Sequence, residues 1–227
     1  MRPAELAARV LYRDPNVLIL DKPHGLPVHA GPKGGPHLGH YLSALTFGLP
    51  KPPALAHRLD RETSGCLVLG RHKQALVRLH ALFEAGRVEK TYWAITVGAP
   101  AEDAGTIDLK LAKKSPERGW HMKVDAAGQE AVTRFRVLGR GDGIAWLELM
   151  PKTGRTHQLR VHCAGMGWPI LGDRIYGKGS AAEAGGKLHL LARAIALPYF
   201  PARPRIEAQA PVPEHMKAML AACGAMI

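Results

Sequence analysis

The chain has 227 residues, and its 31 Lys and Arg outnumber its 19 Asp and Glu, which gives a formal net charge of +12. A surplus of this size suits a polyanionic partner, most commonly nucleic acid, although a soluble basic protein without such a partner can also carry it. The 25 glycines and 18 prolines are too few for a disordered chain, and three widely spaced cysteines suggest neither a disulfide framework nor a thiolate zinc site.

Short strands and turns are predicted for the first part of the chain. The apolar segments 9–12 and 17–20 flank an Asp14-Pro15-Asn16 turn, a pattern that is typical of two strands. The segment 31–39 is rich in glycine and predicts a basic loop, either a plain connector or a lid over substrate. Residues 40–47 then favour a short helix.

Longer elements are predicted in the middle of the chain. The apolar run 66–70 indicates a buried strand, and apolar side chains at helical spacing indicate a helix over 73–85. Residues 88–97 are rich in β-branched and aromatic side chains and predict a further strand. The polar segment 99–130 is predicted as a solvated loop or, alternatively, as an RNA-binding surface around Trp120. The cations of that surface are Lys110, Lys113, Lys114, Arg118 and Lys123.

The last part of the chain predicts three strands and two helices. A strand pair over 131–138 and 144–150 is joined by a glycine-rich turn. In the helix predicted over 156–164, His157 and His162 are five residues apart, so we expect hydrogen bonds from them rather than a shared metal. The remaining predictions are a buried strand over 188–197, an extended segment over 198–213 and a helix over 214–222.

One stretch places a carboxylate between two guanidinium groups: His57-Arg58-Leu59-Asp60-Arg61-Glu62-Thr63-Ser64-Gly65. A carboxylate beside cations stays ionised near neutral pH, which suits a nucleophile or a proton acceptor rather than a general acid. From these residues alone, an ion pair that closes a surface turn is an equally good interpretation.

A second stretch again gathers cations and hydrogen-bond donors around a glycine. It is Lys152-Thr153-Gly154-Arg155-Thr156-His157-Gln158-Leu159-Arg160-Val161-His162. Its arginines suit phosphate groups, or one of them pairs with Asp60.

These stretches resemble a known family, because the run 57–65 is similar to the signature of the RluA-type pseudouridine synthases. Further similar segments follow the family's order: Asp21-Lys22-Pro23-His24-Gly25-Leu26-Pro27-Val28-His29, Lys90-Thr91-Tyr92-Trp93-Ala94, 153–162 and Gly172-Asp173-Arg174-Ile175-Tyr176-Gly177. The resemblance implies one α+β catalytic domain over 1–227, with core motifs in 17–197 and no separate S4-type RNA-binding domain. It also implies a mixed, largely antiparallel sheet with flanking helices and a basic central cleft.

The resemblance further implies that the protein isomerises specific uridines of rRNA or tRNA to pseudouridine. Asp60 matches the family's essential aspartate, Tyr92 the tyrosine that stacks on the target base, and Arg160 the basic residue that pairs with the aspartate. Arg58 matches the arginine that enters the RNA stack where the base has left. The expected substrate-binding residues are Arg58, Arg61, Thr63, Arg155, His157, Leu159 and Ile170, with Leu159 and Ile170 as pocket walls.

No metal or organic cofactor is implied, because the reaction is redox-neutral and the sequence lacks phosphate-binding and dinucleotide-binding glycine motifs. Without a visible signal peptide or membrane span, we expect a cytoplasmic monomer that acts on RNA without an obligate protein partner. Two other interpretations remain open. One is a non-catalytic RNA-binding protein, and the other is a hydrolase that uses Asp60 or the histidines, with or without a metal.

Overall fold

The computed structural model describes residues 2–31, 34–115, 121–177, 179 and 186–226. The chain forms two compact units, Met1–Lys90 with Ala192–Pro211 and Thr91–Leu191 with Val212–Ile227. It passes from the first unit to the second within strand β5 (Glu89–Val97) and returns within strand β11 (Leu190–Leu197). Each unit combines helices with antiparallel strand pairs, which confirms the predicted α+β class and the largely antiparallel pairing.

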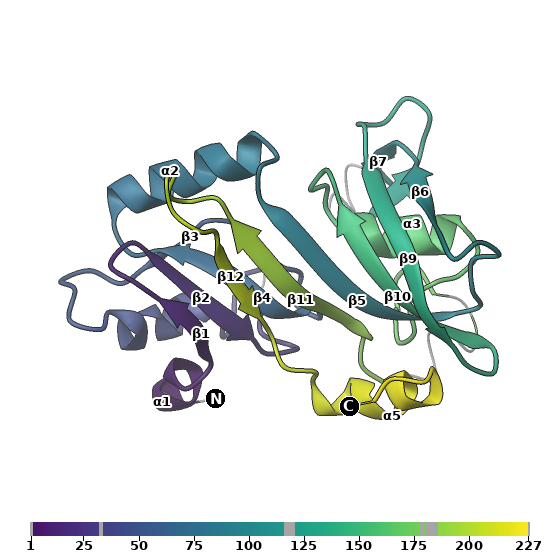
Figure 1. Ribbon diagram of the computed structural model, residues 1–227, viewed down its shortest axis with the longest axis horizontal. Coiled ribbons are helices and arrows are strands. Elements are labelled where there is room, and N and C mark those ends of the chain that lie inside the picture. The colour runs from purple at the N-terminus through teal and green to yellow at the C-terminus, as the bar shows by residue number, and fades with distance from the viewer. Residues whose placement is uncertain (1, 32–33, 116–120, 178, 180–185, 227) are drawn as a thin grey trace. The chain divides into compact units, whose positions relative to one another are not determined.

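The first unit is built around two buried strands. Every residue of β2 (Val17–Lys22) and of β4 (Ser64–Gly70) is buried, and the strands pair antiparallel with Lys22 opposite Gly65. Shorter strands pair with these and with β11, namely β1 (Val10–Arg13) with β2, β3 (Ala54–Leu55) with β4, and β12 (Ile206–Gln209) with β11. Figure 1 shows β1, β2 and β4 side by side. The continuous apolar runs of the sequence therefore form the interior of this unit.

Three helices belong to the first unit: α1 (Pro3–Ala7), the 3-10 helix η1 (Leu38–Leu45) and α2 (Lys73–Glu84). Helix α2 buries Ala75, Leu79 and Leu82, the apolar stripe that its sequence spacing predicts. Its first turn is capped by His72, whose Nδ1 accepts a hydrogen bond from the Ala75 N–H at 3.3 Å. Burial of the apolar stripe thus fixes this helix against its unit.

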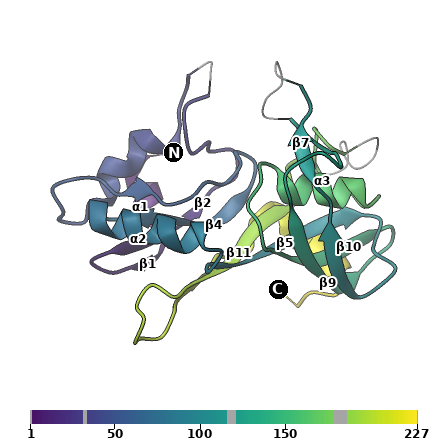
Figure 2. The ribbon, with the colours of Figure 1, turned by 90° about the horizontal axis from the view of Figure 1, so that it is seen from above.

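The second unit contains a run of antiparallel strands in the order β5, β10 (Ile144–Pro151), β9 (Val132–Arg140) and β6 (Ala104–Asp108). Along β10, buried residues alternate with partly exposed ones, as expected of a strand with one face in a core. A separate hairpin pairs β7 (Leu111–Lys113) with β8 (Met122–Val124). Helix α3 (Gln158–Gly165) lies over one face of the strands (Figure 2), and α5 (Glu214–Ala222) lies near the C-terminus (Figure 1).

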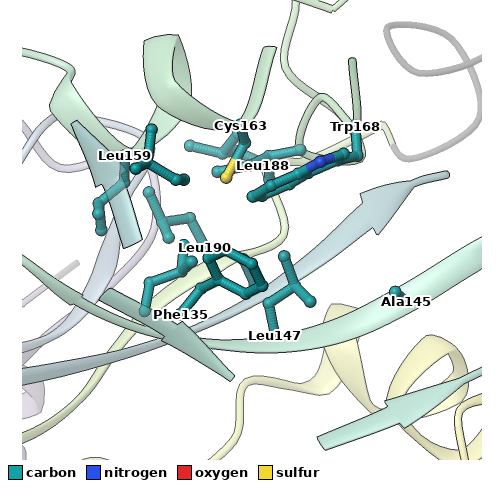
Figure 3. Packing of buried hydrophobic residues seen from close by; sticks show 12 residues of the cluster. Phe135, Ala145, Leu147, Leu159, Cys163, Trp168, Leu188 and Leu190 are labelled. Carbon is teal, nitrogen blue, oxygen red and sulfur yellow. The ribbon is translucent and has the colours of Figure 1, made fainter. Parts of the chain in front are cut away.

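The core of the second unit joins α3 to the strands. Leu159 and Cys163 of α3 pack with Phe135 of β9 and Leu147 of β10, and Trp168 closes the cluster (Figure 3). The rings of Phe135 and Trp168 meet edge to face with their centroids 5.5 Å apart. This packing sets the position of α3, whose polar residues matter for the site.

Most predicted elements are confirmed within one to three residues at each end, and residues 40–47 form a helix of the 3-10 type. The prediction of a solvated loop over 99–130 is wrong, because β6, β7 and β8 lie there and bury Ile107 and Leu111. The extended segment 198–213 contains β12, and α1 was not predicted. The proposed surface at Arg118 and Trp120 falls on residues 116–120, outside the described residues.

Within the described ranges, no helix has the length and apolar character that crossing a membrane requires.

Leu147 tests the importance of the second unit's core. Its side chain is fully buried in the cluster, so Leu147→Ala should lower the free energy of unfolding by about 2–5 kcal/mol. Urea denaturation followed by tryptophan fluorescence measures this loss. The control is Val77→Ala, at a side chain that is 63% exposed on α2 and should change stability by less than about 1 kcal/mol. Similar losses in the two variants would contradict the assignment of this core.

Candidate active site

Asp60 occupies the first position of a tight turn at one end of β4. The carbonyl oxygen of Asp60 accepts a hydrogen bond from the Thr63 N–H at 3.2 Å, and β4 begins at the next residue, Ser64. Leu59 and Thr63 are buried on either side of the turn, while Asp60 itself is partly exposed. Gly65 has a φ of 104°, a conformation that residues with a Cβ rarely adopt. The signature sequence therefore presents one carboxylate on a turn with fixed ends.

The side chain of Lys22 fixes this turn through hydrogen bonds to backbone carbonyl oxygens. Its side chain is fully buried, and its Nζ donates hydrogen bonds to the carbonyl oxygens of Pro23 and Leu26 at 3.0 Å and of Arg61 at 3.1 Å. Three acceptors match the three N–H donors of an ammonium group. The Gly25 N–H also donates to the Arg61 carbonyl at 2.9 Å, so Arg61 is fixed through its backbone.

The charge of Lys22 is opposed by its burial. Burial lowers the pKa of Lys22 to about 7, while the negative charges of Asp60, Glu62 and Asp21 raise it and so favour the ammonium form. Lys22 is therefore close enough to Asp60 for their charges to interact. A lysine in this position places positive charge next to the carboxylate that the signature presents.

Two histidines support the same loop. The Nε2 of His57 accepts a hydrogen bond from the Val68 N–H at 3.0 Å, and its ring stacks on Phe83 with centroids 4.6 Å apart. Burial, assisted by the charge of Lys90, lowers the pKa of His57 to about 3, so this ring is neutral and serves as an acceptor. His24 lies with its Nε2 3.0 Å from the Glu62 carboxylate. Neither ring is placed as a freely exposed catalytic base.

The second unit contains a buried ion pair between Arg160 and Asp173. The Arg160 Nε and Nη2 donate to the two carboxylate oxygens of Asp173 at 2.8 and 2.7 Å. The N–H groups of Ile175 and Tyr176 donate to the same carboxylate at 2.9 and 3.1 Å. Burial raises the pKa of Asp173, but these hydrogen bonds and the charge of Arg160 outweigh it and hold the pKa below its usual range. Arg160 is thus oriented by a fixed partner.

Gln158 fixes the turn that carries Arg155. Its Oε1 accepts from the Thr153 hydroxyl at 2.7 Å and from the Arg155 N–H at 3.0 Å, and its Nε2 donates to the Val132 carbonyl at 3.1 Å. The Arg155 side chain is exposed and donates from Nε to the Glu130 carbonyl at 2.9 Å. A buried amide therefore organises the backbone, and the arginine remains at the surface.

His157 takes the left-handed conformation immediately before α3, with a φ of 52°. Its Nδ1 lies 2.7 Å from the Tyr176 hydroxyl, which also accepts a hydrogen bond from the Met122 N–H at 3.0 Å. His162 is fully buried, with its Nδ1 3.0 Å from the Thr133 hydroxyl. Both histidines therefore form hydrogen bonds, as predicted. Among the described residues, no group of three His, Cys, Asp or Glu side chains is arranged to hold a metal ion.

The three apolar or aromatic site predictions gather in the second unit. Leu159 and Ile170 are buried members of its core cluster, and Tyr92 of β5 is partly buried and packs against that cluster. Leu159 and Ile170 therefore contribute to packing. Tyr92, at the edge of the same cluster, is only partly buried.

The fold places some of the predicted site residues in the first unit and the others in the second. Asp60, Arg58, Arg61 and Thr63 belong to the first, and the second holds Tyr92, Arg155, His157, Leu159, Arg160 and Ile170. Reasoning from the sequence missed the roles of Lys22, Gln158, Asp173 and Tyr176. Each of these lies within a segment that resembles the family, and that position was the only available signal.

Comparisons with known proteins agree with the resemblance. The family model described as RNA pseudouridylate synthase matches residues 16–165, a range that includes parts of both units. An uncharacterised RNA pseudouridine synthase of Zymomonas mobilis is 44% identical over 211 residues, which cover 92% of this chain and 95% of the relative. A mitochondrial pseudouridylate synthase of Xenopus tropicalis is 38% identical over 197 residues, covering 76% of this chain and 61% of the relative.

Two solved human structures share the fold. The RNA pseudouridylate synthase domain containing 4 protein matches with a TM-score of 0.82 at 30% identity, covering 99% of this chain and 96% of that one. The domain containing 1 protein matches with a TM-score of 0.75 at 26% identity, covering 96% and 94%. The mixed, mostly antiparallel sheet with flanking helices is therefore the fold of these proteins.

Lys22→Met tests the buried ammonium through its pH dependence. Between pH of about 7 and 10.5 the unfolded chain binds a proton at Lys22 that the folded chain does not, so wild-type stability should rise with pH in this window. Relative to Lys22→Met, the rise across this window should be on the order of 5 kcal/mol. Chemical denaturation at a series of pH values measures it. The exposed Lys51→Met is the control and should follow the wild-type profile; parallel profiles for Lys22→Met and wild type would refute the assignment.

Asp173→Asn tests the buried ion pair. It leaves the Arg160 guanidinium buried without its countercharge, so unfolding at neutral pH should become easier by about 3–5 kcal/mol. Because the pKa of Asp173 is lowered in the folded protein, the wild-type advantage should shrink as pH falls below about 4. The matched control is Asp103→Asn, which removes an exposed pair with Arg140 at the same 2.7 Å and should cost less than about 1 kcal/mol. Equal effects of the two variants on the denaturation midpoint would contradict the prediction.

Proposed function

This chain belongs to the RNA pseudouridylate synthase family and is an isomerase that acts on uridine in RNA, and we propose that Asp60 is its catalytic aspartate. One observation carries the proposal: Asp60 stands on a turn that Lys22 fixes through the Arg61 carbonyl, with the two charges close enough to interact. A carboxylate held in a fixed position suits a nucleophile or a proton acceptor.

The reaction breaks the bond from ribose C1′ to N1 of uracil, turns the base and joins C1′ to C5. A carboxylate can contribute by attack on the ribose, by attack on the base or by removal of a sugar proton. The cysteines of the chain are poorly suited as nucleophiles, because burial raises the pKa of Cys66 to about 12 and also raises the pKa of Cys163 and Cys223. These thiols stay protonated, so none of them is proposed in place of the carboxylate.

Further residues are proposed for substrate handling. The target base must leave its stack, at a cost of a few kcal/mol. We propose that the Tyr92 ring stacks on it and that the exposed Arg58 enters the vacated place in the RNA. Arg160, oriented by Asp173, is proposed as the basic residue that supports the aspartate in the reaction. The exposed Arg61 and Arg155 suit phosphate groups, and Thr63 and His157 shape the loops that carry them.

The substrate is proposed to be rRNA or tRNA. The net charge of +12 supports contacts with a polyanion, and phosphate contacts offset part of the cost of moving the base. We propose that the enzyme works as a monomer in the cytoplasm without an obligate partner, where its three buried cysteines stay reduced.

Tritium release from RNA labelled at C5 of uridine tests the function. Wild-type protein should release tritium from a transfer RNA pool or from large-subunit rRNA, and Asp60→Asn should slow release by about a thousandfold or more. The matched control is Asp142→Asn, at an exposed carboxylate of the β9–β10 turn, which should keep the wild-type rate. An unchanged rate in Asp60→Asn would remove Asp60 from the reaction. Release of free uracil in place of pseudouridine would support the hydrolase interpretation.

A further inference from the structure

A groove of about 750 Å³ opens in the first unit beside the Asp60 turn. Arg61, the next residue after Asp60, lines it together with His24 and Leu26 of the loop that follows β2. Tyr41 of η1 and Arg9 form further parts of its wall. Nothing in the proposed chemistry uses this groove, although it shares a residue with the turn that carries the catalytic aspartate.

Arg61 presents a positive charge to the groove from a fixed backbone. Its side chain is 69% exposed, and its Nε donates to the Gly25 carbonyl at 3.2 Å. Within the described part of the chain, its two terminal amino groups form no hydrogen bond. Because Lys22 and the Gly25 N–H hold the Arg61 carbonyl, the guanidinium reaches the groove from a defined position. Such a group binds phosphate oxygens well.

Tyr41 supplies a ring on the wall of the same groove. It is partly buried, and its hydroxyl has no hydrogen-bond partner among the residues that the structure describes. Arg9 bonds Asp21 at 2.5 Å and Glu5 bonds Arg2 at 2.6 Å, while the exposed Arg61 forms a looser pair, with its Nε 3.6 Å from the Glu62 carboxylate. The groove therefore offers the terminal amino groups of Arg61, which bond none of the described residues, and the side chain of Tyr41.

We propose that this groove binds a nucleotide next to the target uridine, with its base against Tyr41 and its phosphate at Arg61. The proposal rests on the function proposed above, because a uridine held at Asp60 places its neighbours in the chain within reach of Arg61. A volume of about 750 Å³ lies in the range of pockets that hold small organic ligands and is sufficient for a nucleotide. Stacking of a base on an aromatic ring is tolerant of sequence, so the groove positions the RNA without reading its bases.

A coupling experiment tests the contact between Tyr41 and the neighbouring base. Tritium release would be compared on a stem-loop RNA and on two versions with an abasic ribose at the nucleotide 5′ or 3′ of the target. On the intact RNA, Tyr41→Leu should lower kcat/KM by about 5- to 100-fold, the equivalent of one lost base stack. On one of the two abasic RNAs the wild type should lose a similar factor, and Tyr41→Leu should cause little further loss.

Matched variants distinguish the effect of losing the Tyr41 ring from general damage to the fold. Tyr41→Phe keeps the ring and should retain wild-type kcat/KM, while Tyr12→Leu makes the same change as Tyr41→Leu at a partly buried tyrosine outside the groove and should leave the rate unchanged. Arg61→Gln should weaken binding on every RNA and reduce the salt dependence by about one counterion. Thermal melting checks that each variant is folded.

The outcomes distinguish this proposal from the proposed function. If wild-type protein isomerises uridine but the loss in Tyr41→Leu is equal on intact and abasic RNAs, or absent on all, the groove does not hold the neighbouring base. If wild-type protein releases no tritium from any RNA, the proposed function itself fails.

Discussion

The burial of one ammonium group constrains the whole region around Asp60. A buried cation is unfavourable unless its donors are satisfied, and Lys22 obtains its acceptors from Pro23, Leu26 and Arg61. The first two lie on the loop after β2, and the third lies on the turn before β4, 39 residues after Lys22 in the chain. The loop and the turn must therefore be held in fixed positions relative to each other for the unit to fold. Asp60, which precedes Arg61, receives its position from that requirement.

The second unit also contains a buried charge whose hydrogen bonds are satisfied, and there the charge is negative. The buried carboxylate of Asp173 accepts hydrogen bonds from Arg160 and from two backbone N–H groups. The preceding residue, Gly172, has a φ of 77°, and a Cβ there would lie 2.0 Å from the Lys187 carbonyl oxygen. Only glycine allows this approach. In both units, a buried charge with satisfied hydrogen bonds fixes its surroundings: the turn of Asp60 in the first unit and the buried Arg160 guanidinium in the second.

The sequence predicted every element with a long periodic signal and missed several of the shortest ones. The helix over 73–85 and the strand over 88–97 were found because each repeats its pattern for nine or more residues. Strands β7 and β8 have three residues each, too few for alternation to show, and their neighbours are polar. Asp60 was found from its motif, whereas Lys22 was not, because a lysine is normally exposed and its burial depends on a carbonyl far along the chain.

The polar residues within the family's motifs are of two kinds, buried residues and exposed residues. Lys22, Gln158 and Asp173 are buried and use their side chains to hold the backbone, so they are committed to the fold. Arg58, Arg61 and Arg155 are exposed and can contact RNA. The buried Lys22 specifies where Asp60 stands and is therefore compatible with any substrate of the proposed reaction. For the proposed reaction, selection among RNAs must therefore come from exposed residues, including those outside the motifs.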